Sequence, residues 1–262
     1  MRQSGIKLED VQGVYSGPEG RLWELVMGEQ IHAGGFASST ELAQKAGIKA
    51  GMRGVDLCCA LGAGCRFLAR NFEAVMCGVD ATPYMIEEAR KRAPFAEWGI
   101  EFKLGDVQAV PYPDAAFDFV WGEDAWCYVA DKDRLVGEAD RLLKKGGVVA
   151  FTDWVEGPAG LTEAEALRFN SFMKFPAMES IPGYRTLLEK HGFAVKESVE
   201  IPFAKYVDLY LAMLTEQLTF DALRILGGDI AVFQGLGVEM SDMQANVHAG
   251  KIARGRFIGV RK

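Results

Sequence analysis

The chain has few cysteines, few histidines and no long apolar run, and each scarcity excludes a class of protein. It has five cysteines and three histidines among 262 residues. Cys58, Cys59 and Cys65 lack CxxC spacing and have no histidine nearby, so we expect no metal site and free thiols typical of a reducing cytoplasm. No apolar run approaches the roughly 20 residues of a membrane helix. The first ten residues lack the apolar core of a signal peptide. These observations predict a cytoplasmic protein with no membrane insertion.

Positive charge is also scarce. The sequence has 29 lysines and arginines against 36 acidic residues, a net charge of −7. Such a balance provides no broad attraction for a phosphate backbone, so nucleic acid is not expected as a partner. Hydrophobic residues make up 49% and charged residues 25%, which is typical of a soluble globular protein.

The most informative feature is a pair of short apolar segments, each with an acidic residue at or near its end. The first holds Asp56 and leads into a run of small residues through Gly62, and the second ends at Asp80, 24 positions later. Small residues let the backbone approach a ligand, and an acid at the end of the second strand can accept hydrogen bonds from ribose hydroxyls. The spacing predicts a nucleotide-type cofactor at the carboxyl edge of a parallel sheet. The loop lacks GxGxxG, which disfavours a dinucleotide and an NAD-dependent oxidoreductase.

Strand and helix patterns alternate through the middle of the chain, which predicts a parallel α/β sheet with helices on both faces. Helical periodicity surrounds Leu22 and Leu42. The expected strands are 55–59, 74–79, 100–104, 117–121, 147–154, 193–201 and 256–261, and the expected helices are 65–71, 83–93, 131–143 and 184–192. We predict an N-terminal helical lid over 1–50, a cofactor-binding core over 51–155, a helical cap over 156–250 with late core elements at about 181–202, and a closing strand over 251–262.

These motifs, together with Asp106-Val107, the run from Trp121 to Trp126 and the Gly146-Gly147 turn, resemble the class I S-adenosylmethionine (SAM) dependent methyltransferases. The resemblance implies a Rossmann-like sheet of seven strands, mostly parallel, with an antiparallel last strand. It implies SAM as cofactor, S-adenosylhomocysteine as product and a small-molecule acceptor; a homodimer is left open. The cofactor-binding residues it implies are Asp56, Cys58, Ala60, Gly62, Asp80, Ala81, Asp106, Val107 and Glu123.

A narrower resemblance, to the sarcosine/dimethylglycine N-methyltransferase group, rests on Ile31-His32, Glu123-Asp124, Thr152-Asp153 and Pro182-Gly183 with their neighbours. It implies transfer to an amine nitrogen, with His32, Asp124 and Tyr128 as the catalytic candidates. The group often has histidine where this chain has Tyr128. A carboxylated acceptor would need a cation, and the cap offers four: Arg168, Lys174, Arg185 and Lys205. Related sterol, tocopherol and phosphoethanolamine methyltransferases share parts of the pattern.

Two alternatives stay open. One is C- or O-methylation of a lipophilic molecule, which the apolar cap favours. The other is a SAM-binding module without activity, because the family's Asp-x-Gly-x-Gly-x-Gly reads Asp56-x-Cys58-x-Ala60-x-Gly62 here. A Cβ at the first two glycine positions can block positive φ or crowd the ligand.

Overall fold

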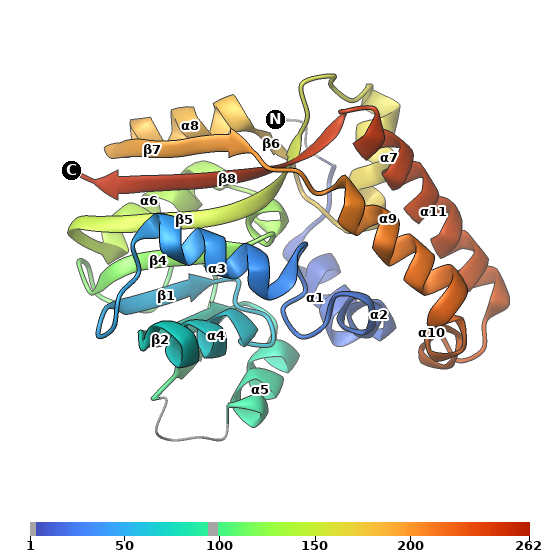
Figure 1. The fold of residues 1–262 in the computed structure, drawn as a ribbon, viewed down its shortest axis with the longest axis horizontal. Helices are drawn as coiled ribbons and strands as arrows, with labels where there is room; N and C mark the ends of the chain where they lie inside the picture. The colour runs from blue at the N-terminus through green and yellow to red at the C-terminus, as the bar shows by residue number, and fades with distance from the viewer. Residues whose placement is uncertain (1–3, 94–98) are drawn as a thin grey trace.

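A single sheet organises the chain, and the computed structural model describes residues 4–93 and 99–262 (Figure 1). The main strands follow in chain order: β1 (Arg53–Leu57), β2 (Val75–Asp80), β3 (Glu101–Leu104), β4 (Phe117–Glu123), β5 (Leu143–Glu156), β7 (Phe193–Glu200) and β8 (Ile252–Arg261). A two-residue strand, β6 (Glu179–Ser180), pairs with the end of β5. The spatial order is β3-β2-β1-β4-β5-β8-β7.

The strand directions are those that the resemblance implies. Strands β1 to β5 pair in parallel, and β8 runs antiparallel to both β5 and β7. Consecutive strands run outward from β1 in one direction and from β4 in the other, so the order reverses between β1 and β4. Ligands of open α/β sheets bind outside the carboxyl ends of the strands at such a reversal. The predicted fold class is confirmed.

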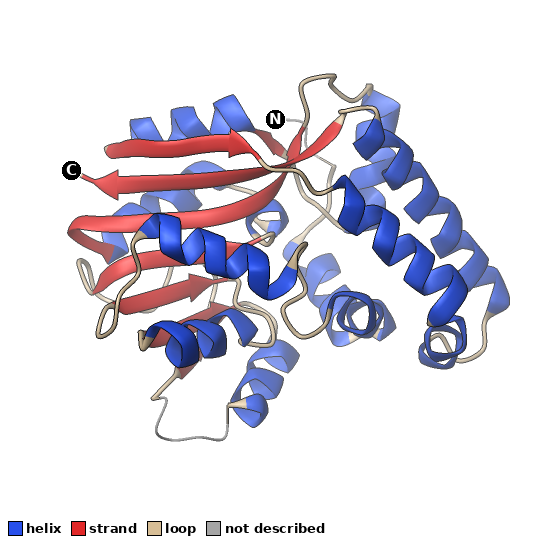
Figure 2. Ribbon diagram, in the orientation of Figure 1, coloured by secondary structure: helices blue, strands red, loops and turns tan. Residues whose placement is uncertain are grey.

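Helices cover both faces of the sheet, as Figure 2 shows. The sheet-covering helices are α3 (Gly35–Ala46), α4 (Ala63–Phe72), α5 (Pro83–Arg92), α6 (Lys132–Leu142) and α8 (Ile181–Lys190). Leu42, Leu68 and Ile86 bring α3, α4 and α5 onto one face, where they pack in one apolar cluster with Phe119 and Trp121. On the other face α6 and α8 pack over Val55, Phe117 and Phe151. Burial on both faces explains why the middle of β5, residues 148–151, is wholly apolar.

A second group of helices lies beyond the carboxyl ends of the strands (Figure 1). It comprises α1 (Leu8–Ser16), α2 (Pro18–Met27), α7 (Glu163–Met173), α9 (Ala204–Ala212), the π-helical turn η3 (Met213–Gln217), α10 (Thr219–Ile225) and α11 (Ile230–His248). Apolar residues of α2, α7, α9 and α11 form their own cluster, together with Trp154 of β5. The N-terminal and late helices therefore pack against each other.

Several predicted boundaries were wrong, each for a local reason. The strand predicted over 55–59 ends at Leu57, because the backbone turns into the left-handed region at Cys58 with φ +68°. The helix predicted from Tyr184 begins at Ile181, where the Ser180 hydroxyl accepts a hydrogen bond from the Gly183 amide and Pro182 lies in the first turn. Helix α1 was not predicted. The helix predicted over 83–93 and the strand predicted from 100 border residues 94–98, which lie outside the described part of the chain.

Candidate active site

The two predicted strand-end acids lie at the carboxyl edge of the sheet, beside the reversal of strand order. Asp56 lies in β1, and Asp80 is the last residue of β2. Both side chains are buried. Burial raises the pKa of each carboxyl above its usual range; for Asp56 the neighbouring charge of Glu123 is the next cause. Each acid is therefore placed to meet a ligand that stabilises its charged form.

The loop of small residues between β1 and α4 does adopt positive φ. Cys58 has φ +68°, Ala60 +43° and Gly62 +70°. The expectation that Cβ-bearing residues could block this backbone is therefore wrong. The conformation is held from outside the loop, because the amides of Cys58 and Cys59 both donate to the carbonyl of Val79 at 2.9 and 3.1 Å. Left-handed backbone costs a non-glycine residue about 1–2 kcal/mol, which these contacts must offset.

Asp80 fixes this loop as well as facing the cleft. One oxygen, Oδ2, accepts from the amide of Ala60 at 2.9 Å, and Oδ1 accepts from the amide of Thr82 at 2.8 Å. Each carboxylate oxygen has further acceptor capacity. Asp80 can therefore hold the loop and accept two hydroxyl groups of a ligand at once.

The third predicted group follows β3. Asp106 is exposed, and its Oδ1 accepts from the amide of Gln108 at 2.8 Å, which forms a tight turn. Val107 is buried within this turn. Gln12 of α1 donates from Nε2 to the carbonyl of Ala81 at 2.7 Å, so α1 is tied to the end of β2. The turn after β3 and the end of β2 thus flank the same cleft.

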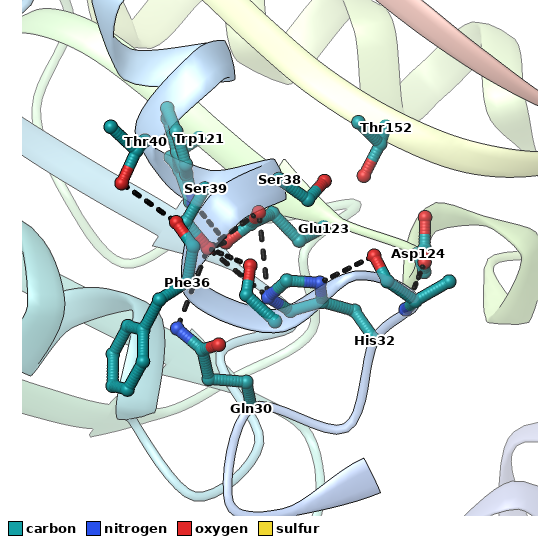
Figure 3. A network of polar contacts seen from close by, with 12 residues as sticks. Gln30, His32, Phe36, Ser38, Ser39, Thr40, Trp121, Glu123, Asp124 and Thr152 are labelled. Atoms are coloured by element: carbon teal, nitrogen blue, oxygen red, sulfur yellow. Dashed lines mark hydrogen bonds and ion pairs between the residues drawn. The ribbon is translucent and has the colours of Figure 1, made fainter. Parts of the chain in front are cut away.

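His32 lies in a buried polar network with Ser39 and Glu123 (Figure 3). Its Nε2 is 3.2 Å from the Ser39 hydroxyl and 3.5 Å from Oε1 of Glu123. Its Nδ1 is 3.2 Å from the carbonyl of Ala33. The Ser39 hydroxyl and the Trp121 indole N–H both contact the Glu123 carboxylate, at 3.0 and 3.1 Å. Both ring nitrogens of His32 therefore have partners within the protein.

Asp124 is one half of a buried ion pair that joins three distant segments. Its Oδ1 accepts from Nε of Arg254 in β8 at 2.7 Å, and its Oδ2 accepts from the amide of Ala33 at 2.9 Å. Both charged side chains are almost fully buried, at 1% and 2% exposure. Arg254 also donates to the hydroxyls of Ser38 and Thr152, each at 3.0 Å. The pair fixes the segment that carries His32 over the end of β4.

Tyr128 ends a short 3-10 turn, η2 (Trp126–Tyr128), and contacts the N-terminal segment. The Tyr15 hydroxyl of α1 donates to its hydroxyl at 2.7 Å, and the two rings lie edge to face with centroids 5.4 Å apart. Burial raises the pKa of both phenols, so both stay protonated at neutral pH. Tyr15 was missed by the sequence analysis, because a single tyrosine in an unpredicted helix gives no pattern.

These residues line one cleft with an empty volume of about 1080 Å³, part of which opens to solvent. Its walls include eleven of the twelve predicted site residues: His32, Asp56, Cys58, Ala60, Asp80, Ala81, Asp106, Val107, Glu123, Asp124 and Tyr128. Gly62 is not brought to the wall; it is the capping residue before α4, where a Cβ would lie 2.5 Å from the Phe102 ring.

The charges around the cleft have one sign. Apart from cysteines and tyrosines, its ionisable lining comprises six carboxyl groups and His32, and no lysine or arginine of the described residues lines it. Phosphate groups are held in proteins by cations, helix N-termini or both. An acidic cleft of this kind suits a cofactor that carries positive charge and no phosphate.

Within residues 4–93 and 99–262, no group of three or more histidine, cysteine or acidic side chains is arranged to hold a metal ion. No helix in the same ranges is both long and apolar enough to cross a membrane.

Comparison with known proteins places this cleft in a family. Residues 55–151 match the family model described as a methyltransferase domain. Residues 55–151 therefore carry a methyltransferase domain. Domains of this class use SAM, so the predicted recognition and cofactor class are confirmed.

Three similar proteins indicate the range of the class. Phosphoethanolamine N-methyltransferase 1 of Arabidopsis thaliana is 27% identical over 174 residues, which cover 65% of this chain and 35% of that protein. Phosphoethanolamine N-methyltransferase 2 of Haemonchus contortus, solved with SAM, superposes with a TM-score of 0.82 at 20% identity, over 97% of this chain and 59% of that one. A Galdieria sulphuraria protein, described provisionally as a sarcosine dimethylglycine methyltransferase, superposes at 0.78 with 21% identity over 92% and 97%.

The chain spans about a third of the length of the first curated relatives it matches. At 20–21% identity the solved structures establish the fold of the methyltransferase domain and not its substrate.

Proposed function

We propose that this protein is a SAM-dependent methyltransferase that acts on the amine nitrogen of a small molecule. The observation that carries the proposal is the acidic cleft at the reversal of strand order, where Asp56 and Asp80 face a backbone loop and no described lysine or arginine lines the wall. The matching methyltransferase domain model and the N-methyltransferases among the relatives support the same reaction.

The residues of the cleft fit SAM. Asp80 would accept from the ribose hydroxyls, with both oxygens already oriented by backbone amides. Asp56 would face the cationic methionine end, and the turn at Asp106 and Val107 would lie at the adenine. When bound, SAM supplies a methyl group on a sulfonium, whose departure leaves a neutral thioether. Such chemistry asks the protein for alignment and exclusion of water.

The acceptor nitrogen must be neutral when the methyl group is transferred, because its lone pair forms the new bond to the methyl carbon as the bond from sulfur breaks. A primary or secondary amine then releases its extra proton to solvent. Tyr128 is proposed to contact the acceptor, since its ring and hydroxyl line the cleft beside α1. Asp124 and His32 are proposed as positioning residues, because each is fully engaged with protein partners.

The cellular location, the role of residues 1–50 and the exclusion of nucleic acid are also proposals. Five free cysteines, four of them with a thiol pKa raised by burial, support a reducing cytoplasm. We propose that residues 1–50 act as a lid, since α1 contacts both the end of β2 and Tyr128. The acidic cleft also argues against a nucleic-acid acceptor.

The test compares SAM affinity by calorimetry for the wild type and Asp80→Ala. Loss of two charge-assisted hydrogen bonds, about 1.5–3 kcal/mol each, should weaken binding at least about 100-fold. Asp114→Ala is the control, because its carboxyl is 79% exposed and pairs with Arg141, and neither residue lines the cleft. Unchanged affinity in Asp80→Ala would contradict the ribose role.

A further inference from the structure

Two more cavities adjoin the cofactor cleft on the side of the second helix group. The inner pocket has an empty volume of about 450 Å³, part of which opens to solvent, and shares Tyr15, Ile31, Asp124 and Tyr128 with the cleft. The outer pocket, about 760 Å³ and also partly open, lies among α2, α7, η3 and α11 and shares Trp23 and Met240 with the inner pocket. The three cavities therefore adjoin in series, separated by side chains that they have in common.

The walls of both pockets are aromatic and aliphatic. Trp154 and Tyr210 line the inner pocket with Tyr15 and Tyr128, and Leu226 and Leu236 line the outer one. Val232, at 51% exposure, lies at the outer pocket, so this cavity reaches the surface. Aromatic faces bind an ammonium group through their negative π-electron density, and the aliphatic walls favour an alkyl or ring substituent. Met240, at the partition between the two pockets, has a flexible side chain that adapts to ligands of irregular shape.

The ionisable residues of these walls, apart from tyrosine, are all acidic. Asp124 lines the inner pocket and is paired with Arg254, and Glu19 and Glu239 line the outer pocket. Among the described residues, no lysine or arginine lines either pocket. An anionic group here would lose its hydration beside carboxylates without gaining a counter-charge, which is strongly unfavourable.

The cationic side chains suggested for a carboxylated acceptor are already paired or lie outside the pocket walls. Arg168 is bound to Asp242 at 2.6 Å and to Glu239, a wall residue of the outer pocket, at 2.9 Å, so two carboxylates balance its charge. Arg185 pairs with Glu189 at 2.9 Å on exposed helix surface. The ammonium of Lys205 lies 4.8 Å from the centre of the Tyr206 ring, and Lys174 lines neither pocket.

We infer that the acceptor is an amine with an extended apolar substituent and no anionic group, its nitrogen beside Tyr15 and Tyr128 and its apolar part directed across Trp23 and Met240. This inference rests on the proposed function, and it assigns the substrate class of the same site. It excludes acceptors that carry a phosphate or a carboxylate beside the amine.

Binding of unreactive probes tests the inference apart from catalysis. In the presence of saturating S-adenosylhomocysteine, calorimetry would compare decyltrimethylammonium, tetramethylammonium and decanoate, all below micelle-forming concentrations. Burial of three to four methylenes should make the decyl cation bind on the order of 100-fold tighter than tetramethylammonium. Decanoate, with a tail of similar length and a negative head, should bind at least about 100-fold more weakly than the decyl cation. Equal affinity of cation and carboxylate, or no gain from the tail, would overturn the inference.

A matched pair of variants locates the tail. Leu236→Trp fills the outer pocket and should weaken the decyl cation about tenfold while leaving tetramethylammonium unchanged. Val238→Trp, two residues along α11 at 59% exposure and outside the pocket lining, should change neither. An equal effect of both variants would contradict the assigned position. The probe comparison on the wild type decides the inference even if Leu236→Trp does not fold.

Transfer from labelled SAM separates the two proposals. Label on short amines with no preference for the tail would refute the acceptor class and leave the proposed function standing. Tight binding of the decyl cation with no label on N,N-dimethyldecylamine or any other amine would refute the proposed function, while the chemistry of the pockets would stand.

Discussion

The buried ion pair between Asp124 and Arg254 should be the most stability-critical polar contact at the cleft. Replacing Arg254 by methionine keeps most of the side-chain volume and removes the charge. The carboxylate of Asp124, 1% exposed, would lose the guanidinium and keep the hydrogen bond from the Ala33 amide. Breaking a buried pair from one side costs about 3–5 kcal/mol, because one charge is left without its partner.

Two further contacts place Arg254→Met at the upper end of that range. Arg254 also donates to Ser38 and Thr152, and each lost hydrogen bond is worth about 0.5–1.5 kcal/mol. A free energy of unfolding of about 5–15 kcal/mol would be reduced by a third or more. The double variant Asp124→Asn/Arg254→Met should have a free energy of unfolding at least about 2 kcal/mol higher than that of Arg254→Met. Asparagine tolerates the φ of +52° at position 124 and leaves no unpaired charge.

Urea denaturation of the wild type, both single variants and the double variant gives the coupling energy directly. Arg185→Met is the control, because its pair with Glu189 is more than half exposed and should contribute less than about 1 kcal/mol. A loss below about 1 kcal/mol in Arg254→Met, or additive effects in the double variant, would refute the reasoning.

Three other changes have defined outcomes. Ala60→Gly should stabilise the fold by up to about 1 kcal/mol in urea denaturation, because its φ is +43°, whereas Ala69→Gly within α4 should destabilise it by a similar amount. Burial raises the pKa of Asp153 to about 6 against 3.8 for the free side chain, so the unfolded chain ionises first and wild-type stability falls as pH rises from 4 to 6. Asp153→Asn has no carboxyl to titrate, so the free energy of unfolding of this variant, relative to that of the wild type, should rise by up to about 3 kcal/mol between pH 4 and 7. A difference in unfolding free energy that stays constant with pH would argue against the raised pKa. Tyr128→Phe removes the hydroxyl contact to α1 and should lower kcat about tenfold with SAM affinity retained, while Tyr84→Phe on α5 should change neither.

The local pattern of the sequence was sufficient for the sheet, and with the family resemblance it was sufficient for most of the cleft wall. Acids at strand ends meet at one edge of a parallel sheet whatever the loops between them do, so Asp56 and Asp80 could be placed from their positions in the sequence, and Asp106 from the resemblance. The left-handed backbone at Cys58 and Ala60 could not, because it depends on the carbonyl of Val79 and the carboxylate of Asp80.

The partner of Asp124 was equally hidden. Arg254 is 130 residues away and reaches Asp124 only because β8 pairs antiparallel with β5, with Arg254 opposite Trp154. The sequence offered four cations in the cap as acceptor contacts, and the described part of the structure brings none of them to a pocket wall. Charge pairing over such separations is set by tertiary structure and leaves no periodic trace.

The most direct test of the proposed function is transfer of label from methyl-labelled SAM to a pooled set of amines, amino acids, thiols, phenols and lipophilic rings, followed by mass spectrometry of the products. The proposed function predicts label on nitrogen, and the acceptor inference predicts that apolar amines are labelled ahead of amino acids. Label on carbon, oxygen or sulfur would contradict the amine acceptor. Absence of label on every acceptor, in protein that binds SAM, would contradict the catalytic function.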